Sequence, residues 1–552
     1  MLQISQFRIP IHHTDDQLRK SVSKALDVRP DKLGRIKIKQ RAVDARKRTE
    51  ILFCYTLLVE VREEDRVLHH MGRPGRIERA PDESYRELEE VGGAVSEGAS
   101  VDPSSPAAPG KAKPSVVVVG TGPCGLFCGL LLARQGYNPI LLERGKAAGP
   151  RARDVTGFWR RGWDFDPNSN VQFGEGGAGT FSDGKLYTQI RDRENRIPWI
   201  LKELAKAGAP EDILVKSRPH VGTDRLIKVV RTIREEIISL GGDVRFETRV
   251  TDVVLEKGTM RAVKTDKGEF IEADRFVFAI GHSSRDTFEA LHERGVPFEA
   301  KPFSVGVRIE HPQTLMDHSQ FGAMAGDPLL GAAAYKFVAH APTNRAAYSF
   351  CMCPGGLVVA AASEPGMVVT NGMSSYSRAE ANANAGFMVD VKPEDFASKD
   401  VLGGIEFQRS LERRAYVIGG ENYHAPAQLL GDFMRGKAST GPGKVKPSYE
   451  PGVKWTDLRE VLPDFVCDTI REAVPMIDKS LRGFLLEDAI MTGVETRSSS
   501  PVRIPRHPDT CECISVKHFY PAGEGAGYAG GIISAAVDGM RVAERIIASV
   551  SE

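Results

Sequence analysis

The chain has 552 residues, of which 41% are hydrophobic, and 74 Lys and Arg balance 73 Asp and Glu to a formal net charge of +1. This length predicts two or three domains with ample core, and the charge balance gives no global attraction to nucleic acid or membranes. The eight cysteines are too few for a disulfide scaffold. They form no CxxC pair or Cys/His cluster with zinc spacing, so we expect no metal.

Residues 1–85 are predicted to form a small α+β module. Residues 3–11, 34–43 and 51–61 have the composition and alternation of strands, and Asp15–Leu26 has the spacing of an amphipathic helix. From residue 92 to residue 114, 17 of 23 residues are Gly, Ala, Ser or Pro. This composition predicts a flexible linker over residues 86–114.

The first 50 residues carry 13 Lys and Arg against 6 Asp and Glu, a local excess of seven positive charges. One interpretation is a solvated basic face of the module. The other is a docking surface for RNA or another anionic partner. No pattern of aromatic residues suited to base stacking accompanies the charge, and both interpretations stay open.

The second domain opens with a dinucleotide fingerprint. Four valines predict a buried strand, Gly120, Gly122 and Gly125 follow with GxGxxG spacing, and an apolar helix comes next. A second strand ends in Glu143, 23 positions after Gly120. In this arrangement the glycines allow a tight turn and close approach of a pyrophosphate to the helix N-terminus. The acidic residue can accept the hydroxyls of an adenosine ribose.

The same segment contains 18 consecutive uncharged residues, 116–133, which is long enough to suggest a membrane span. Its internal glycines and Pro123 fit a strand and a helix better than one lipid-spanning helix. The N-terminal MLQISQFRIP lacks the apolar region of a signal peptide. We therefore expect no membrane span and a cytoplasmic protein.

Further along, residues 224–240 predict a helix, and residues 276–280 predict an apolar strand that ends at Gly281. This returning strand is expected beside the dinucleotide-binding sheet. Residues 335–370 have the pattern of strands, and residues 395–490 that of helices and loops. We predict a nucleotide-binding domain made of residues 115–345 and 490–552, with residues 346–489 inserted as a substrate or cap domain.

Two other glycine clusters match GxGxxG formally. Gly174, Gly176 and Gly179 lack a preceding strand and a following apolar helix, so they cannot form a second Rossmann turn. Residues 525–530 precede a good helix, but too few residues follow for a complete βαβ unit. The chain therefore combines one complete dinucleotide unit, one mid-chain glycine loop and one glycine turn at a helix N-terminus.

This combination resembles the two-dinucleotide-binding-domain flavoproteins, the glutathione-reductase-like superfamily. Within it, the chain is most similar to a bacterial and plastid group of uncharacterised FAD-dependent dehydrogenases, through NVQFGEGGAGTFSDGKLYT, FCMCPGG, TNGMS, ETRSSSPVRI and YPAGEGAGYAGGIISAAVDG. The resemblance implies an α/β fold: a Rossmann-like FAD-binding domain, an inserted α+β substrate domain and the small N-terminal α+β module. It also implies non-covalent FAD.

The resemblance assigns the residues expected to bind FAD. The late motif has Glu524 where the superfamily usually has Asp, which changes the expected contact with the ribityl chain. The predicted FAD-binding residues are Gly120, Gly122, Pro123, Cys124, Gly125, Glu143, Arg144, Gly176, Gly177, Thr180, Lys185, Val250, Gly281, Gly523, Glu524, Gly530, Gly531 and Ile532.

The expected reaction is hydride transfer between flavin N5 and an organic small-molecule substrate. No second complete dinucleotide fingerprint exists, so NAD(P)H, if it donates electrons, would bind transiently without a Rossmann domain of its own. Two alternatives stay open. One is an RNA-associated or tRNA-modifying flavoprotein that docks RNA through the basic module, and the other is a non-catalytic flavin-bound sensor or assembly protein.

Four side chains are candidates for the chemistry. Cys351 and Cys353 form a CxC pair that could exchange electrons or add to substrate, or could simply line the pocket. His282 follows the returning strand and is either an acid/base group or a hydrogen-bonding residue. Arg497 could bind a substrate carboxylate in bidentate fashion or form a salt bridge.

Overall fold

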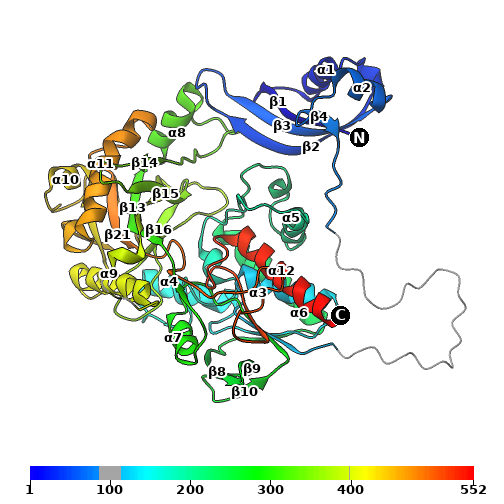
Figure 1. Ribbon diagram of the computed structural model, residues 1–552. Coiled ribbons are helices and arrows are strands. Elements are labelled where there is room, and N and C mark those ends of the chain that lie inside the picture. Colours follow the sequence, from blue (N-terminus) through cyan, green and yellow to red (C-terminus); the bar gives the residue numbers. More distant parts are fainter. Residues whose placement is uncertain (86–112, 397, 399, 552) are drawn as a thin grey trace, which may run out of the picture.

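The computed structural model describes residues 1–85, 113–396, 398 and 400–551 (Figure 1). Most of the predicted linker, residues 86–112, lies outside the described residues. No helix within the described ranges is long and apolar enough to cross a membrane. Over the same ranges, no group of three His, Cys, Asp or Glu side chains is arranged to hold a metal ion.

The N-terminal module is a four-stranded antiparallel sheet with two helices. Thr14 and Gln17 form a capping box at the start of the first helix, and Leu18 and Val22 of that helix are buried in the module core. The strand order is β2 (Leu33–Asp44), β3 (Leu52–Val61), β1 (Leu2–Pro10) and β4 (Ile77–Arg79), and the helices are α1 (Asp15–Leu26) and α2 (Glu64–Met71).

The module packs against the rest of the chain at several places, among them contacts with each of the larger domains. Its core includes Phe321 and Ala333, which belong to the second domain. At the β2 edge, the Arg41 N–H donates to the Val215 carbonyl at 2.7 Å, and the Ser217 N–H donates to the Arg41 carbonyl at 2.9 Å. The module therefore contacts both larger domains.

The nucleotide-binding domain contains a five-stranded parallel sheet. Because helices cover both faces of such a sheet, its strands are continuously apolar, as the four buried valines of β5 are. The strand order is β23 (Phe519–Pro521), β11 (Arg275–Phe278), β5 (Val116–Val119), β6 (Ile140–Leu142) and β7 (Asp243–Arg245). The returning strand β11 lies beside β5 as expected.

Helix α3 (Pro123–Arg134) begins at the fingerprint turn and is buried on nearly all sides, packed between α12 (Ile532–Ser551) and α6 (Thr223–Ser239) (Figure 1). A smaller antiparallel sheet stands below this layer in Figure 1. Its strands are β8 (Val250–Glu256), β9 (Thr259–Thr265) and β10 (Phe270–Glu272), and the remaining helices of the domain are α4 (Ala148–Arg161), α5 (Arg196–Lys206) and α7 (Arg285–Glu293).

The second domain is built on a seven-stranded mixed sheet. The strand order is β14 (Val338–His340), β15 (Ala346–Cys353), β18 (Asn382–Val391), β13 (Phe303–Pro312), β21 (Ile490–Glu495), β19 (Ala425–Leu429) and β20 (Val453–Trp455). Its helices are α8 (Gln313–Phe321), α9 (Gly403–Gly419), α10 (Leu430–Arg435) and α11 (Asp464–Ser480). There are also two short antiparallel strand pairs. One is β16 (Leu357–Ala360) with β17 (Thr370–Met373), and the other is β12 (Glu299–Ala300) with β22 (Val502–Arg503).

The second domain begins earlier and ends later in the chain than the predicted insertion, residues 346–489. Strands β13 and β14 precede residue 346, and β21 follows residue 489, yet all three belong to the second sheet. β13 is buried over nine of its ten residues and pairs with β18 and β21 on its two sides. Such a central strand lacks alternation, and its partners are far away in sequence, so the pattern alone could not assign it to a sheet.

Candidate active site

One cavity of about 640 Å³ lies where the two domains meet. Its walls come from the fingerprint turn, the glycine loop, the returning strand, the start of α12 and the strands β15 and β17 of the second domain. Of the predicted FAD-binding residues, Gly125, Gly176 and Thr180 do not line this cavity, and all the others do. The four chemical candidates also line it, so residues up to 400 positions apart meet at one site.

The fingerprint turn requires glycine for three separate reasons. Gly120 has φ of 99°, and a Cβ there would lie 2.5 Å from the Ala279 carbonyl oxygen. A Cβ at Gly125 would lie 1.9 Å from the Gly120 carbonyl oxygen, so the helix and strand could not pack. A Cβ at Gly122 would meet only the Gly177 Cα at 3.9 Å, which leaves this backbone open to the cavity. The α3 N-terminus beside it is suited to bind an anion.

Glu143 directly follows β6 and connects two loops. Its carboxylate accepts hydrogen bonds from Thr121 N and Oγ1 at 3.0 and 2.7 Å, from Gly145 N at 2.9 Å and from Gly174 N at 3.0 Å. These four donors connect the fingerprint turn to the mid-chain glycine loop. Glu143 thus positions the site, and the contact with an adenosine ribose stays a prediction.

The glycine loop, residues 174–185, is shaped by Arg151, which sequence reasoning missed. The buried guanidinium donates to the carbonyl oxygens of Asn170, Val171 and Glu175 at 2.7–2.9 Å and of Gly174 at 3.2 Å. Thr180 Oγ1 donates to the Glu175 carbonyl, so this predicted residue stabilises the loop from inside. The loop runs between the starts of α3 and α12.

The other end of the cavity is the turn before α12. Asp538 accepts a hydrogen bond from Gly523 N at 2.8 Å and pairs with the buried Arg506, which fixes this turn. Glu524 lines the cavity, and its burial raises its pKa to about 7, against the opposing effect of Lys301. A Cβ added at Gly281, Gly530 or Gly531 would meet no heavy atom within 4 Å, so these backbones border open space.

Three family models match the chain: an FAD-binding domain over residues 113–156, an FAD-dependent protein C-terminal domain over 302–498, and a domain of unknown function over 1–60. An uncharacterised protein of Clostridium beijerinckii is 44% identical over 547 residues, which are 99% of this chain and 98% of that protein. The chain belongs to this family of FAD-dependent flavoproteins.

Two further similarities are more distant. Tetracenomycin B2 monooxygenase-dioxygenase of Streptomyces olivaceus is 24% identical over 167 residues, 28% of this chain and 30% of that protein. The solved structure of flavin-dependent brominase Bmp2 aligns over 80% of each chain with 12% identity and a TM-score of 0.37.

The cavity of this flavoprotein fits FAD, its cofactor. A pyrophosphate would lie at the backbone of Gly122 and the α3 N-terminus, where no side chain intrudes. The glycines at 281, 530 and 531 leave room where a Cβ would enter the cavity. Glu143 after the second strand and Ile532 at the start of α12 both line this one cavity.

The CxC pair lies on a distorted edge of β15. The pairing of β15 with β18 shifts register between Phe350 and Cys353. The backbone of Cys351 has φ of 40°, a conformation that residues other than glycine rarely adopt. Arg308 Nη2 donates to the Cys351 carbonyl at 3.0 Å, and Cys353 Sγ contacts the same oxygen at 3.2 Å. As a result Cys351 is exposed in the cavity wall and Cys353 is buried.

Behind this wall lies a buried pair that the sequence did not reveal. Arg308 Nη1 is 3.2 Å from Glu495 Oε2, and Arg308 also donates to Asn384 Oδ1. Burial raises the pKa of Glu495 to about 7, although Arg308 acts in the opposite direction. Arg308 and Glu495 stand on the neighbouring strands β13 and β21, which could be recognised as partners only from the sheet order.

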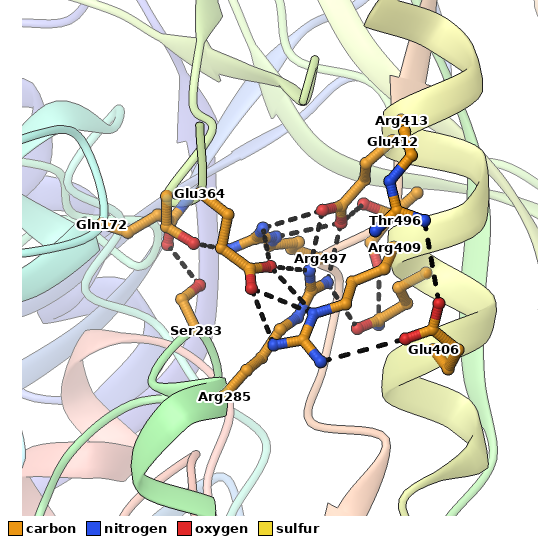
Figure 2. A network of polar contacts seen from close by, with 12 residues as sticks. Gln172, Ser283, Arg285, Glu364, Glu406, Arg409, Glu412, Arg413, Thr496 and Arg497 are labelled. Carbon is orange, nitrogen blue, oxygen red and sulfur yellow. Dashed lines mark hydrogen bonds and ion pairs between the residues drawn. The ribbon is translucent and has the colours of Figure 1, made fainter. Parts of the chain in front are cut away.

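Arg497 lines the cavity, but its guanidinium is engaged by Glu412 of α9, with Nε–Oε1 and Nη2–Oε2 distances of 3.1 and 2.9 Å (Figure 2). Arg285 binds the same carboxylate with two hydrogen bonds of 2.8 Å. Burial alone would raise the pKa of Glu412, but the two guanidinium groups hold it well below its usual range. Arg497 therefore forms a salt bridge, and its binding of a substrate carboxylate stays a prediction.

The network of Figure 2 continues to both sides of this carboxylate. Glu364 pairs with Arg285 and Arg409, and Thr496 Oγ1 donates to Glu412 at 2.6 Å. These residues join the start of α7 in the nucleotide-binding domain to α9 and the chain after β21 in the second domain. The network thus fixes the wall of the cavity across the domain boundary.

His282 lies beside this network. Its Nδ1 is 2.9 Å from Ser283 Oγ, which in turn donates to Gln172 Oε1 at 3.1 Å. Burial, together with the charges of Arg497 and Arg285, lowers the pKa of His282 to about 3. The imidazole is therefore neutral near pH 7, and its role as an acid/base group or a hydrogen-bonding group stays a prediction.

Proposed function

We propose that this FAD-dependent oxidoreductase is a dehydrogenase or reductase that exchanges hydride with an organic substrate. The observation that supports this is the continuity of the cavity. The dinucleotide-binding residues and the second-domain strands β15 and β17 line one space. A cofactor held at the fingerprint turn and a substrate held against β15 would therefore meet without crossing a protein wall.

The flavin, when bound, supplies hydride transfer at N5, and the protein supplies orientation and charge. Lys185 is the cation best placed for the second task. Its ammonium group lies 3.1 Å from Asp183 Oδ2 and lines the cavity. Burial alone would lower its pKa, but Asp183 and the neighbouring thiols hold the pKa above its usual range, so Lys185 stays charged. A fixed cation stabilises negative charge that develops near it.

Anaerobic half-reactions test the proposal. The FAD-loaded protein is photoreduced without oxygen and mixed with a panel of unsaturated, carbonyl-bearing and hydroxylated metabolites, while the flavin absorbance is recorded. Reoxidation by a substrate in the absence of oxygen is the expected result. Reoxidation that always requires oxygen would indicate monooxygenase-type chemistry and contradict the proposal. Reduction of the oxidised protein by NADH and NADPH, tested in the same way, identifies the transient donor.

A further inference from the structure

One part of the cavity wall contains two lysines, two aromatic rings and a thiol. We call it the outer wall and define it by Lys185, Tyr187, Lys336, Phe350 and Cys351, all of which line the cavity. None of them belongs to the dinucleotide fingerprint or to the α12 turn. This surface is the one that a substrate would meet if the proposed function is right.

Two hydrogen bonds between residues 337 and 349 join two segments of the outer wall. The Ser349 N–H donates to the Phe337 carbonyl at 3.0 Å, and the Phe337 N–H donates to Ser349 Oγ at 3.0 Å. This antiparallel pairing continues β14 toward Lys336 and sets it beside the residues that precede the Cys351 bulge. Lys185 and Tyr187 line the same cavity as these residues.

The charges of the outer wall are not neutralised. Asp183 pairs with two cations, Lys185 and Arg378, at 3.1 and 2.6 Å, which leaves this triad with one net positive charge. Lys336 is exposed and makes no ion pair with any residue that the structure describes. Glu495, the carboxylate behind Cys351, is already engaged by Arg308. Two uncompensated positive charges therefore face the space beside Tyr187 and Phe350.

Two aromatic rings and two lysines suit an organic molecule with an apolar body and a negative group. The apolar part would lie against Tyr187 and Phe350, and the anion would be attracted by the lysines, because a cleft of one charge sign concentrates ligands of the opposite sign. We propose that the outer wall binds the substrate through an anionic group, with Lys336 as the main specificity-determining residue. This inference rests on the proposed function, because it deepens the identity of its substrate.

Cys351 provides a reporter that needs no knowledge of the substrate. Cys351 is an exposed residue that lines the outer wall. Desolvation raises the pKa of its thiol to about 12, so both reagents are compared at the same mildly alkaline pH, at which lysine stays charged. Iodoacetate and iodoacetamide are similar in size and alkylate thiols by the same displacement of iodide, but only iodoacetate is an anion. Their rates of reaction at Cys351 of the full-length, FAD-loaded protein can be followed by mass spectrometry of the labelled peptide. The ratio of the two rates, divided by the same ratio for the uncharged N-acetylcysteine amide, measures the preference for an anion.

We expect this normalised ratio to exceed one by about two- to fivefold at low salt, the effect of a partly exposed charge pair, and to fall toward one in about 0.5 M NaCl. Lys336→Gln should remove most of the preference and Lys336→Arg should keep it. Lys444→Gln, which removes an exposed lysine outside the cavity, is the matched control. Equal FAD content and equal thermal unfolding would show that the variants are folded.

A normalised ratio at or below one, or a ratio that Lys336→Gln leaves unchanged, would overturn the inference. Bound FAD could neutralise the lysines with its own phosphates, and the loaded protein would then give such a ratio. Failure of both reagents to alkylate Cys351 would also overturn it, since the thiol would not be in the wall. The labelling does not depend on turnover, so failure of the anaerobic assay and failure of this one are distinguishable.

Discussion

The two walls of the cavity are built on different physical principles. The cofactor wall, around the fingerprint turn and the start of α12, consists largely of glycine backbone that borders open space without side chains, and Gly120 and Gly125 of its turn have no room for a Cβ. The opposite wall is held by buried ion pairs, Arg285 and Arg497 on Glu412 and Arg308 on Glu495. The cofactor wall depends on local backbone geometry, and the opposite wall depends on charges that compensate one another across domains. Substitutions in the two walls should therefore affect FAD binding and stability differently.

The largest effect is expected at Glu412, which is fully buried between two guanidinium groups. Glu412→Gln leaves Arg285 and Arg497 without their shared counter-charge, and breaking a buried pair costs about 3–5 kcal/mol of unfolding free energy. Urea denaturation measures the loss. Glu406→Gln on the same helix, at a carboxylate that is 62% exposed, should change stability by less than about 0.5 kcal/mol. Equal effects of the two substitutions would contradict the importance of the network.

At the cofactor wall, Gly125→Ala is expected to remove bound FAD and to cost about 1–3 kcal/mol, because its Cβ would overlap the Gly120 carbonyl. FAD content of the purified protein and thermal unfolding are the measurements. Gly149→Ala is the matched control, since a Cβ there would meet nothing within 4 Å. A yellow, fully loaded Gly125→Ala protein would show that the turn adjusts more easily than its geometry implies.

A substitution at Glu143 can distinguish a residue that positions the loops from one that only contacts the cofactor. Because its carboxylate accepts four hydrogen bonds from the protein itself, Glu143→Gln should destabilise even the FAD-free protein, by about 2 kcal/mol. The exposed Glu272→Gln serves as control. If the FAD-free variant were as stable as the wild type and only FAD affinity fell, Glu143 would act on the ribose alone.

The smallest effect is a pH dependence at Glu524. Its pKa is about 7 in the folded protein and near 4.5 in the unfolded chain, so the folded state binds the extra proton between these values. The contribution to stability is complete below about pH 4.5 and is lost as pH rises through 7. We expect the FAD-free wild type to lose about 1 kcal/mol relative to Glu524→Gln between pH 5 and pH 8, measured by denaturant unfolding. Parallel pH profiles would refute the raised pKa.

The cofactor wall could be predicted from the sequence much better than the ion pairs of the opposite wall. The parallel sheet, the helices α3 and α6, the cofactor and most residues of the cofactor wall follow from local patterns, because glycine spacing and apolar runs are visible in short segments. The residues Arg151, Arg285, Arg308 and Glu412 were missed. Each depends on a partner tens to hundreds of positions away, and nothing in its own neighbourhood distinguishes it from an ordinary surface charge.

The domain border shows the same limit. Strand β13 was assigned to the nucleotide-binding domain because it follows the returning strand directly, yet it pairs with β18 and β21. The sequence also could not predict that Cys351 is exposed and Cys353 is buried. This difference comes from a bulge in β15 that depends on its pairing with the neighbouring strand β18. Their chemical roles stay predictions.

The packing of Phe321 and Ala333 into the N-terminal core bears on how this protein can be recombined with its relatives. A chimera that exchanged only residues 1–85 would place a foreign core against α8 and the segment after it. The smallest unit that can be exchanged as a whole therefore includes that segment, although it is more than 200 residues away in sequence. For the same reason, deleting the module to test the predicted RNA docking would also uncover apolar surface, so reversing its unpaired basic charges is the cleaner experiment.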